Sequence, residues 1–468
     1  MNKYLCICIC LMLSLPLNGQ GLFESAQENE DKTEAKANPI GGFIRSAMYI
    51  GSTTDEDVPY LQSIFGQLAI TSDIELGKYG SAYADLRFRY GNEFQQDVSE
   101  LDLREAYVDL FCGPLNLRSG KQIVSWGSTS FLNPSDQFSP KNPIVRSPDP
   151  DDMKIGTWSM NAKLSISGSS SLQILWMPLY QSSVLLTEPF TFPGYIEFTD
   201  PDWPAPEIRN SSFGFLYDLR SSILDGSLSY YNGFRNNPKF TLKSASFNQS
   251  TFAPDQIELY QEPYRIHSAG LNLSVPLGSY IFRTELAWMA PVDEAEENIY
   301  LPFSEISYIG EIEQTGANVT FIAGYYGKYI LSFKAPTVEP SGITGSFPDL
   351  TTLIPPGEPV TPELIDGIIA SQIDAFDRLY DYQLEEFYHS VYASLTINLL
   401  TDALTLELPG MYNITTKELM LSPGISYSVT DGLIIKAGYS YLKGEENTLY
   451  NMVGPILNAG YLSFKVLF

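Results

Sequence analysis

Charged side chains occupy every second position in several short segments of this sequence, with apolar residues between them. One segment places Asp85, Arg87 and Arg89 on one parity and Leu86 and Phe88 on the other. Successive side chains of a β-strand point to opposite faces, so each such segment is predicted to carry one charged and one apolar face. The candidates for a polar inner wall are Asp85, Arg87, Arg89, Glu105, Asp109, Arg118, Arg283, Glu285, Glu407, Lys436 and Lys465.

The chemistry that this wall offers is ion pairing and solute selection. Asp73, Glu75, Asp218 and Arg220 fall on the same faces, so acids and bases are nearly balanced. A basic ladder that would select phosphate or another anion is not visible in this pattern. Paired inward charges could also serve only to stiffen the wall, and the sequence leaves that alternative open.

The sequence offers few candidates for catalytic residues. The chain has two histidines, His267 and His389, and Cys112 is the one cysteine beyond the N-terminal apolar run. We therefore expect no catalytic residues, no metal site and no cofactor, and we do not expect an enzyme. Acidic clusters at 149–152, 200–202 and 293–297 could bind Ca²⁺ through carboxylate oxygens. A solvated acidic surface is the alternative, because no spaced calcium loop of a known type is present.

The elements that must position the charged wall are short alternating segments. Eighteen are predicted, and sixteen would also fit: 43–50, 61–76, 79–91, 100–112, 115–124, 157–167, 170–177, 210–220, 226–234, 264–275, 279–290, 304–313, 319–332, 384–399, 403–412, 418–428, 433–442 and 458–468. Their connections alternate between tight turns and longer segments such as 92–99, 125–156 and 333–383. Short turns at one end and long loops at the other are typical of an outer-membrane barrel. The predicted fold is all-β: a closed antiparallel transmembrane β-barrel with long extracellular loops and one loop helix.

The end of the chain fits this prediction. Residues 460–468 alternate apolar and polar side chains and stop on an aromatic residue, Phe468. The last strand of such a barrel must pair with the first, because lipid does not tolerate an open sheet edge. A terminal aromatic resembles the signal that the barrel-assembly machinery reads. The chain is 13% aromatic, which suits the two aromatic girdles of a membrane barrel surrounded by lipid.

The N-terminus predicts export. Lys3 precedes an apolar run that ends near Pro16, as in a secretory signal peptide cleaved near residue 20. We expect residues 1–20 to be the signal peptide, 21–42 a periplasmic tail and 43–468 the barrel. The predicted location is the outer membrane of a diderm bacterium. The net charge of −27 argues against nucleic acid as a partner and is expected to lie mainly in the loops and the tail.

A helix is predicted at 361–380, inside the longest loop. Thr361 is a suitable N-cap, Pro362 suits the first turn and Glu363 suits the positive end of the helix dipole. Residues such as Ile365, Ile369 and Phe376 form an apolar stripe at helical spacing. The stripe could cover the mouth as a plug or pack against neighbouring loops.

The most distinctive sequence motif lies around residues 122–136. Trp126 is expected at the outer membrane interface, Gly127 permits a sharp exit from the strand, and Asn133 and Asp136 belong to a turn-forming string. These four residues mark a rim or constriction loop. The loop could fold inward and narrow the pore, or it could cap the rim.

The same region resembles a known family. Residues 103–110 read LREAYVDL, 115–127 read LNLRSGKQIVSWG, 133–136 read NPSD and 175–178 read LWMP. This pattern resembles an uncharacterised outer-membrane barrel family, classed as a domain of unknown function. The sequence departs from the family pattern at Lys121, where arginine is commoner, and at Ser119, where an apolar residue is commoner. The resemblance implies an envelope-transport role beside RND-type (MmpL-like) exporters of hydrophobic or lipid-like molecules.

Together, these observations predict a porin-like channel or export conduit in contact with outer-membrane lipid. Its predicted partners are the barrel-assembly machinery, through the C-terminal strand, and an RND-type exporter system. The alternative is a non-conducting barrel that displays binding or adhesion loops at the surface. The substrate, the direction of transport and the oligomeric state are left open.

Overall fold

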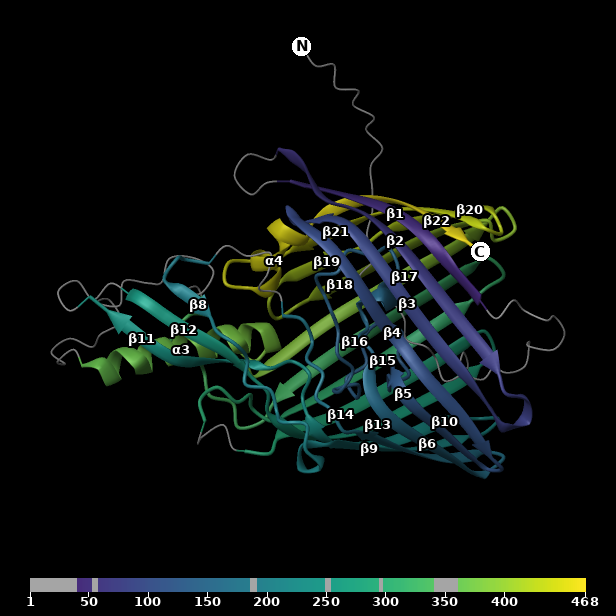
Figure 1. Cartoon of the computed structure of the whole chain (residues 1–468), viewed down its shortest axis with the longest axis horizontal. Coiled ribbons are helices and arrows are strands. Elements are labelled where there is room, and N and C mark those ends of the chain that lie inside the picture. The colour runs from purple at the N-terminus through teal and green to yellow at the C-terminus, as the bar shows by residue number, and fades with distance from the viewer. Residues whose placement is uncertain (1–39, 53–57, 186–191, 249–253, 294–297, 341–360) are drawn as a thin grey trace, which may run out of the picture.

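The computed structural model describes residues 40–52, 58–185, 192–248, 254–293, 298–340 and 361–468. It shows a closed antiparallel barrel of eighteen strands (Figure 1). The barrel strands are β1 (Ile40–Ser52), β2 (Pro59–Glu75), β3 (Gly80–Glu93), β4 (Gln96–Cys112), β5 (Leu115–Gln122), β6 (Thr157–Ser167), β7 (Ser170–Met177), β9 (Ser212–Arg220), β10 (Asp225–Phe234), β13 (Arg265–Leu277), β14 (Tyr280–Pro291), β15 (Glu305–Thr315), β16 (Val319–Ile330), β17 (Phe387–Leu399), β18 (Leu404–Asn413), β19 (Glu418–Leu421) with β20 (Gly424–Thr430), β21 (Leu433–Lys443) and β22 (Ala459–Leu467). β19 and β20 both lie between β18 and β21 and together form one interrupted strand.

The predicted closure is confirmed. β22 pairs with β1 in an antiparallel register that places Ile44 opposite Val466 and Arg45 opposite Lys465. Backbone hydrogen bonds extend this pairing to the last residue, because Gly42 N donates to Phe468 O at 3.0 Å and Phe468 N donates to Gly42 O at 3.1 Å. The barrel therefore has no open edge at this seam, as a sheet in lipid requires. The expected signal peptide (1–20) and most of the tail (21–42) lie outside the described residues.

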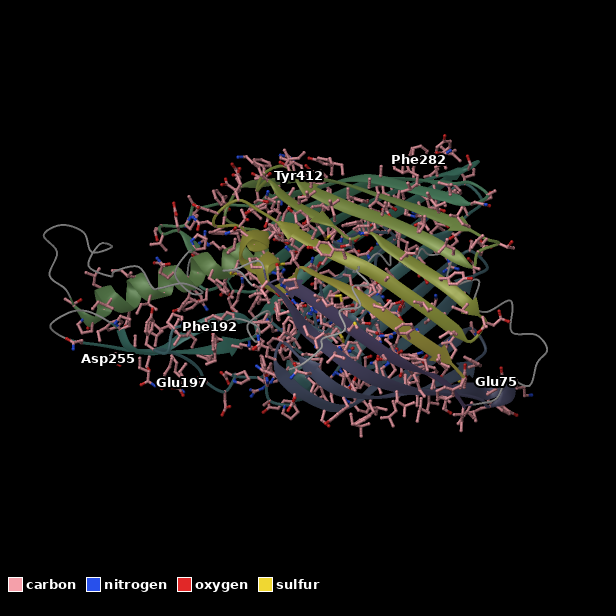
Figure 2. All side chains as sticks on the ribbon, turned by 90° about the horizontal axis from the view of Figure 1, so that it is seen from above. Glu75, Phe192, Glu197, Asp255, Phe282 and Tyr412 are labelled. Carbon is pink, nitrogen blue, oxygen red and sulfur yellow. The ribbon has the colours of Figure 1, made fainter. Side chains whose placement is uncertain are left out.

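The two faces of the wall differ as the alternation predicts. Leu86, Val108 and Val466 are exposed on the outer surface, whereas Arg87 and Asp109 point inward and are largely shielded. Phe282 and Tyr412 project outward from the barrel wall in Figure 2. An apolar exterior around a polar interior is the arrangement of a membrane barrel. Within the described residues, no helix is both long and apolar enough to cross a membrane.

The ends of the barrel differ in the length of their connections. One end has tight turns, such as Gly113-Pro114 between β4 and β5, where Gly113 has a φ of 62°. The other end carries the long loops, although 92–99 is not one of them. β3 and β4 continue into this region and join through a two-residue turn at Phe94 and Gln95, with φ values of 48° and 66°.

A small lobe projects from the long-loop end (Figure 1). Its sheet consists of β8 (Ile196–Phe198), β12 (Pro254–Glu262) and β11 (Lys239–Phe247), none of which the sequence pattern predicted as strands. Helix α3 (Pro362–Asp381) lies on this sheet, and the Thr361 side chain accepts a hydrogen bond from Leu364 N as its N-cap. Ile369 and Ile373 of α3 pack in one buried cluster with Ile257 and Leu259 of the sheet. The apolar stripe of the predicted helix is thus covered by neighbouring loops.

Short helices also connect strands within the described residues. The unpredicted helix α4 (Leu449–Leu457) connects β21 to β22 and contacts β21. The described part of the chain also contains three 3₁₀ helices: η1 (Gly77–Tyr79), η2 (Pro150–Met153) and η3 (Ile208–Asn210). Of these, η2 lies in the long β5–β6 connection, whose path through the barrel forms the candidate site.

Candidate functional site

Residues 123–156, which connect β5 to β6, form a segment that we name the constriction loop. Its first turn is held at the wall, because Ile123 N donates to Glu105 Oε1 at 2.8 Å. Gly127 then adopts a φ of 125°, and a Cβ there would lie 2.3 Å from Asn133 Oδ1. The local turn therefore requires glycine.

Trp126 does not lie at the outer membrane interface, so that prediction is wrong. Its side chain is only 4% exposed and lies in an interior cluster with Leu175, Leu216 and Tyr231. Its ring meets Phe138 edge-on with centroids 4.6 Å apart. The indole thus attaches the constriction loop to the inner face of the barrel, because burying it there removes far more apolar surface from water than a position at the rim would.

Two inward glutamates bind the first half of the loop. Glu285 on β14 is fully buried and accepts hydrogen bonds from Ser135 N at 2.6 Å and from Ser128 N at 3.4 Å. Glu311 on β15 accepts from Ser130 N at 3.0 Å. Each carboxylate thus satisfies backbone donors that would otherwise be buried without partners.

Two aspartates near η2 bind a group of cations on the opposite wall. Asp152 Oδ2 lies 2.5 Å from Arg45 Nη1, and its Oδ1 lies 2.5 Å from Arg87 Nη1 and 2.9 Å from Arg104 Nη1. Asp149 pairs with Arg45, with Lys436 at 2.6 Å and with Lys465 at 2.8 Å. We name Asp149, Asp152 and the five cations Arg45, Arg87, Arg104, Lys436 and Lys465 the loop clamp.

The clamp determines the ionisation of its two carboxyl groups. Burial alone would raise the pKa of Asp149, but Arg45, Lys436 and Lys465 hold that pKa well below its ordinary value of 3.8. Burial also opposes ionisation of Asp152, and Arg45, Arg87 and Arg104 again lower the pKa well below 3.8. Both groups are therefore anionic at neutral pH and hold the cations around them.

We expect the clamp to be insensitive to mild acid. A carboxyl group with a lowered pKa stabilises the folded state above its unfolded pKa, and this contribution is lost as the pH falls through the folded pKa. Asp149 and Asp152 should therefore keep their ion pairs from neutral pH down to about pH 5, and a conductance increase that depends on them should appear in single-channel recordings only under much stronger acid. A rise near pH 6 that is absent when both aspartates are replaced by asparagine would contradict this expectation.

The two attachments lie on opposite sides of the ring. Between β4 and β14 the ring contains β5, β6, β7, β9, β10 and β13, and between β15 and β1 it contains β16, β17, β18, the interrupted β19–β20, β21 and β22. A loop bound to β14 and β15 by its first half and to β1, β3 and β4 by its second half must cross the lumen. The constriction loop therefore folds inward across the lumen and does not merely cap the rim.

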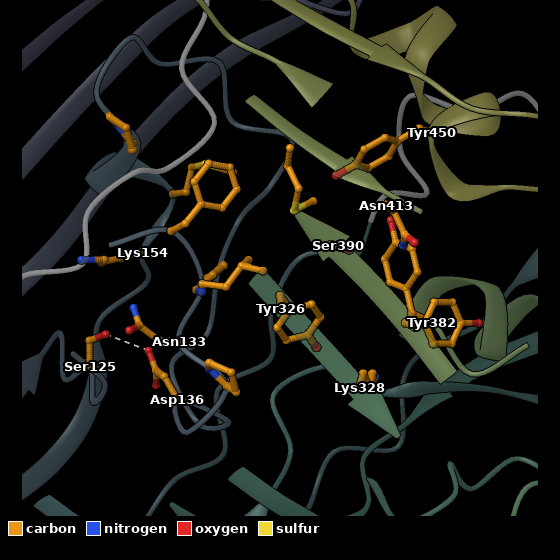
Figure 3. Close-up of a pocket in the computed structure, with 18 residues that line it drawn as sticks. Ser125, Asn133, Asp136, Lys154, Tyr326, Lys328, Tyr382, Ser390, Asn413 and Tyr450 are labelled. Atoms are coloured by element: carbon orange, nitrogen blue, oxygen red, sulfur yellow. Dashed lines mark hydrogen bonds between the residues drawn. The ribbon is translucent and has the colours of Figure 1, made fainter. Parts of the chain in front are cut away.

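The crossing leaves a cavity of about 370 Å³ between the loop and the wall (Figure 3). On the loop side, Asn133 and Asp136 line it, and Ser125 Oγ donates to Asp136 at 2.7 Å. Burial raises the pKa of Asp136 despite Lys141, Ser139 and Ser125, which lower it. Across from the loop, the barrel wall contributes Tyr326, Tyr388 and Met411, while Tyr382 follows α3 and Tyr450 lies in α4. Lys328, Ser390 and Asn413 complete this side of the cavity. The cavity therefore offers ring faces and a few hydrogen-bonding groups to a small solute.

The remaining inward candidates lie at several other places on the wall. Asp85 pairs with Arg87 at 2.9 Å beside the clamp, and Arg89 donates to Arg146 O in the constriction loop at 2.6 Å. Asp109 and Arg118 form a bidentate pair at 2.9 Å between β4 and β5. Arg283 lies 2.8 Å from Glu311. Glu407 is exposed on β18 and makes no hydrogen bond to the constriction loop within the described residues.

Several residues of the site were not predicted. Arg104 is the extra residue of a β-bulge, because Asp85 pairs with Glu105 and Leu86 pairs with Leu103. Strict alternation along the strand would therefore assign Arg104 to the outer, lipid-facing side. Glu311 lies between Gly310 and Ile312, so its alternation was visible in the sequence, whereas Arg45 is followed by Ser46 and shares its face with Phe43 and Ala47, which weakened the pattern there. The sequence predicts either a Ca²⁺ site or a solvated acidic surface at 149–152, whereas Asp149 and Asp152 bind cations of the wall. Within the described residues, no group of three or more His, Cys, Asp and Glu side chains is arranged to hold a metal ion.

No protein-family model and no curated relative matches the chain. Similar solved structures exist. The crystal structure of Pseudomonas aeruginosa OpdO has a TM-score of 0.51 at 11% identity over 92% of this chain and 96% of that one. For P. aeruginosa OccK9 (OpdG) the values are 0.51, 8%, 92% and 97%, and for OccK5 (OpdH) they are 0.50, 10%, 92% and 97%. These proteins are outer-membrane porins, and the likeness shows that this chain has the porin-type barrel fold.

Proposed function

We propose that this protein is an outer-membrane channel whose constriction loop selects the solutes that pass. The observation that carries the proposal is the loop crossing the lumen, attached to Glu285 and Glu311 on one side and to the clamp on the other. Rigid attachment at both ends fixes the size of the passage and the groups that line it. Selection by pore width and lining is the ordinary means by which porins discriminate between solutes.

The charges on the wall favour solutes without a strong anionic character. The five cations of the clamp are already paired with Asp149 and Asp152, and Lys141, which also lines the cavity, interacts with Asp136. Two lysines of the cavity are likewise paired, Lys154 with Asp151 at 2.8 Å and Lys328 with Glu305 at 2.6 Å. Small amphipathic solutes that present an apolar or aromatic face to the tyrosine-lined wall fit this cavity best.

The more specific proposal is passage of hydrophobic or lipid-like molecules in partnership with an inner-membrane RND-type exporter. Its support is the motif resemblance in residues 103–178, together with the ring and thioether faces in the cavity. Co-purification of the protein with an exporter complex from the native envelope would test the partnership separately from conduction.

Planar bilayer recording tests the proposed channel. Purified, heat-modifiable full-length protein is expected to give discrete conductance steps that are small for an eighteen-stranded barrel, because the loop occupies much of the cross-section. Asp366→Asn, on the exposed side of the lobe helix α3, is the control, since this side chain lies away from the lumen and its change should leave the step size unchanged. Folded protein that inserts without any conductance would reject the channel.

A surface-display protein is the second candidate, and the lobe is the observation that favours it. The sheet of β8, β11 and β12 with α3 forms its own buried core beyond the barrel mouth. A barrel that does not conduct in bilayer recordings, but whose lobe binds a partner, would support this candidate.

A further inference from the structure

A second cavity, of about 500 Å³, lies beside the lobe at the long-loop end of the barrel. This volume falls within the range of small-molecule sites, about 300–1,000 Å³. Its lining comes from two segments, residues 180–185 and 203–204, and from Gln261 at the end of β12. Nothing in the proposed channel mechanism uses this cavity, and its properties stand independently of conduction.

Two aromatic rings form one side of this cavity. The Trp203 side chain is 40% exposed, and its ring lies against Tyr180 with centroids 5.4 Å apart and planes tilted by 50°. Tyr180 is fixed from behind by Phe234, at 5.7 Å, and its hydroxyl donates to Asn236 O at 3.3 Å. Trp203 therefore presents an open ring face on a rigid support.

The backbone around Trp203 is also constrained. Pro201, Pro204 and Pro206 flank it and limit the conformations of the segment. Asp202 N donates to Gln261 O at 3.0 Å, which fixes Trp203 beside the lobe sheet. Because little freedom remains to be lost, binding on this ring would carry a small ordering cost.

The polar groups of the cavity are neutral. Gln181, Ser182 and Gln261 contribute amide and hydroxyl groups, which can both donate and accept hydrogen bonds, and the described lining contains no charged side chain. A ligand that suits this lining is uncharged, has one flat C–H face for the ring and carries several hydroxyl groups around its edge. A pyranose sugar has this chemistry.

We propose that the Trp203–Tyr180 cavity is a saccharide-binding site at the outer mouth of the barrel. The site is connected to the constriction loop, because Val184 N donates to Lys141 O at 2.9 Å and Lys141 also lines the lumen cavity. A sugar bound here is held next to the segment that narrows the pore.

Saturation-transfer NMR and calorimetry on the full-length protein in a detergent without a sugar headgroup test the proposal. The probes are maltotriose, cellotriose and N-acetylchitotriose, with trigalacturonate as the charged comparison. At least one neutral trisaccharide is expected to bind saturably, and Trp203→Ala should weaken its affinity about tenfold. Trp203→Phe should retain most of the affinity, and Trp158→Ala, which removes an exposed tryptophan from the barrel wall, should change nothing.

Gln181→Ala with Gln261→Ala gives an independent pair of substitutions if Trp203→Ala does not yield heat-modifiable barrel. These substitutions should weaken binding of the neutral sugar and leave the barrel folded. Absence of saturable binding of all three neutral probes, equal binding by Trp203→Ala, or preferred binding of trigalacturonate would each overturn the proposal. None of these outcomes depends on whether the barrel conducts, so a failure here is distinguishable from a failure of the channel.

Discussion

Replacing Asp149 and Asp152 together by asparagine is expected to open the barrel, with a several-fold rise in unitary conductance and a noisier open state. Asp152 alone holds three arginines, and the side chains of Arg45 and Arg104 are 0% and 8% exposed. Removing one partner of a buried ion pair costs about 3–5 kcal/mol, because the remaining charge stays buried without compensation. The five cations would then repel one another, and the second half of the constriction loop would leave the wall.

Asp151→Asn is the matched control for this experiment. It makes the same chemical change in the same 3₁₀ helix, but the Asp151 carboxylate pairs with Lys154 and is 45% exposed. Its backbone carbonyl, which accepts from Arg104, is unchanged by the substitution. The loop should therefore stay attached, and the several-fold rise in conductance should not occur. An unchanged conductance in the double variant would show that Glu285, Glu311 and Trp126 hold the loop without the clamp.

Asp381→Asn is expected to loosen the lobe from the barrel. This carboxylate, at the end of α3, lies 2.6 Å from Lys239 Nζ and 3.3 Å from Arg235 Nη1, and all three side chains are largely buried. Burial acts to raise the pKa of Asp381, but Arg235 and Lys239 hold it well below its ordinary value. Neutralising the group leaves two buried cations without their shared partner, at a cost of about 3–5 kcal/mol.

Hydrogen exchange followed by mass spectrometry measures this effect. Peptides from β11 and the last turns of α3 should exchange much faster in Asp381→Asn, while peptides from barrel strands such as β14 should not change. Asp366→Asn lies on the exposed side of the same helix and should alter stability by no more than about 0.5 kcal/mol. Equal protection of the lobe in both variants would mean that its apolar core alone fixes its position.

The barrel strands could be predicted because each is defined by a local property of the chain. Apolar and polar residues alternate over much of most barrel strands, because lipid lies outside and water inside. The lobe strands β11 and β12 alternate as well, but they lie in segments whose length already marked them as loops. α4 contains Gly454 and Pro455, which obscure a helical pattern.

The path of the constriction loop could not be read from the sequence. Its attachments join residues far apart in the chain, such as Arg45 with Asp149 and Ser135 with Glu285, and no local pattern records such pairings. Trp126 gave a misleading signal, since an aromatic residue at the end of a strand suits an interfacial girdle as well as an interior anchor. The bulge at Arg104 removed a further residue from the predicted wall, because an inserted residue shifts parity without changing composition.

The register between β1 and β22 places two positive charges side by side where the barrel closes. Arg45 and Lys465 are direct cross-strand neighbours on the first and last strands, and like charges in that position repel. Asp149 accepts from both, with Lys465 Nζ at 2.8 Å, so one carboxylate from the middle of the chain neutralises the junction of its two ends. The segment that narrows the passage therefore also joins the two ends of the barrel sheet, and its contact with Lys465 can form only when the final strand has docked.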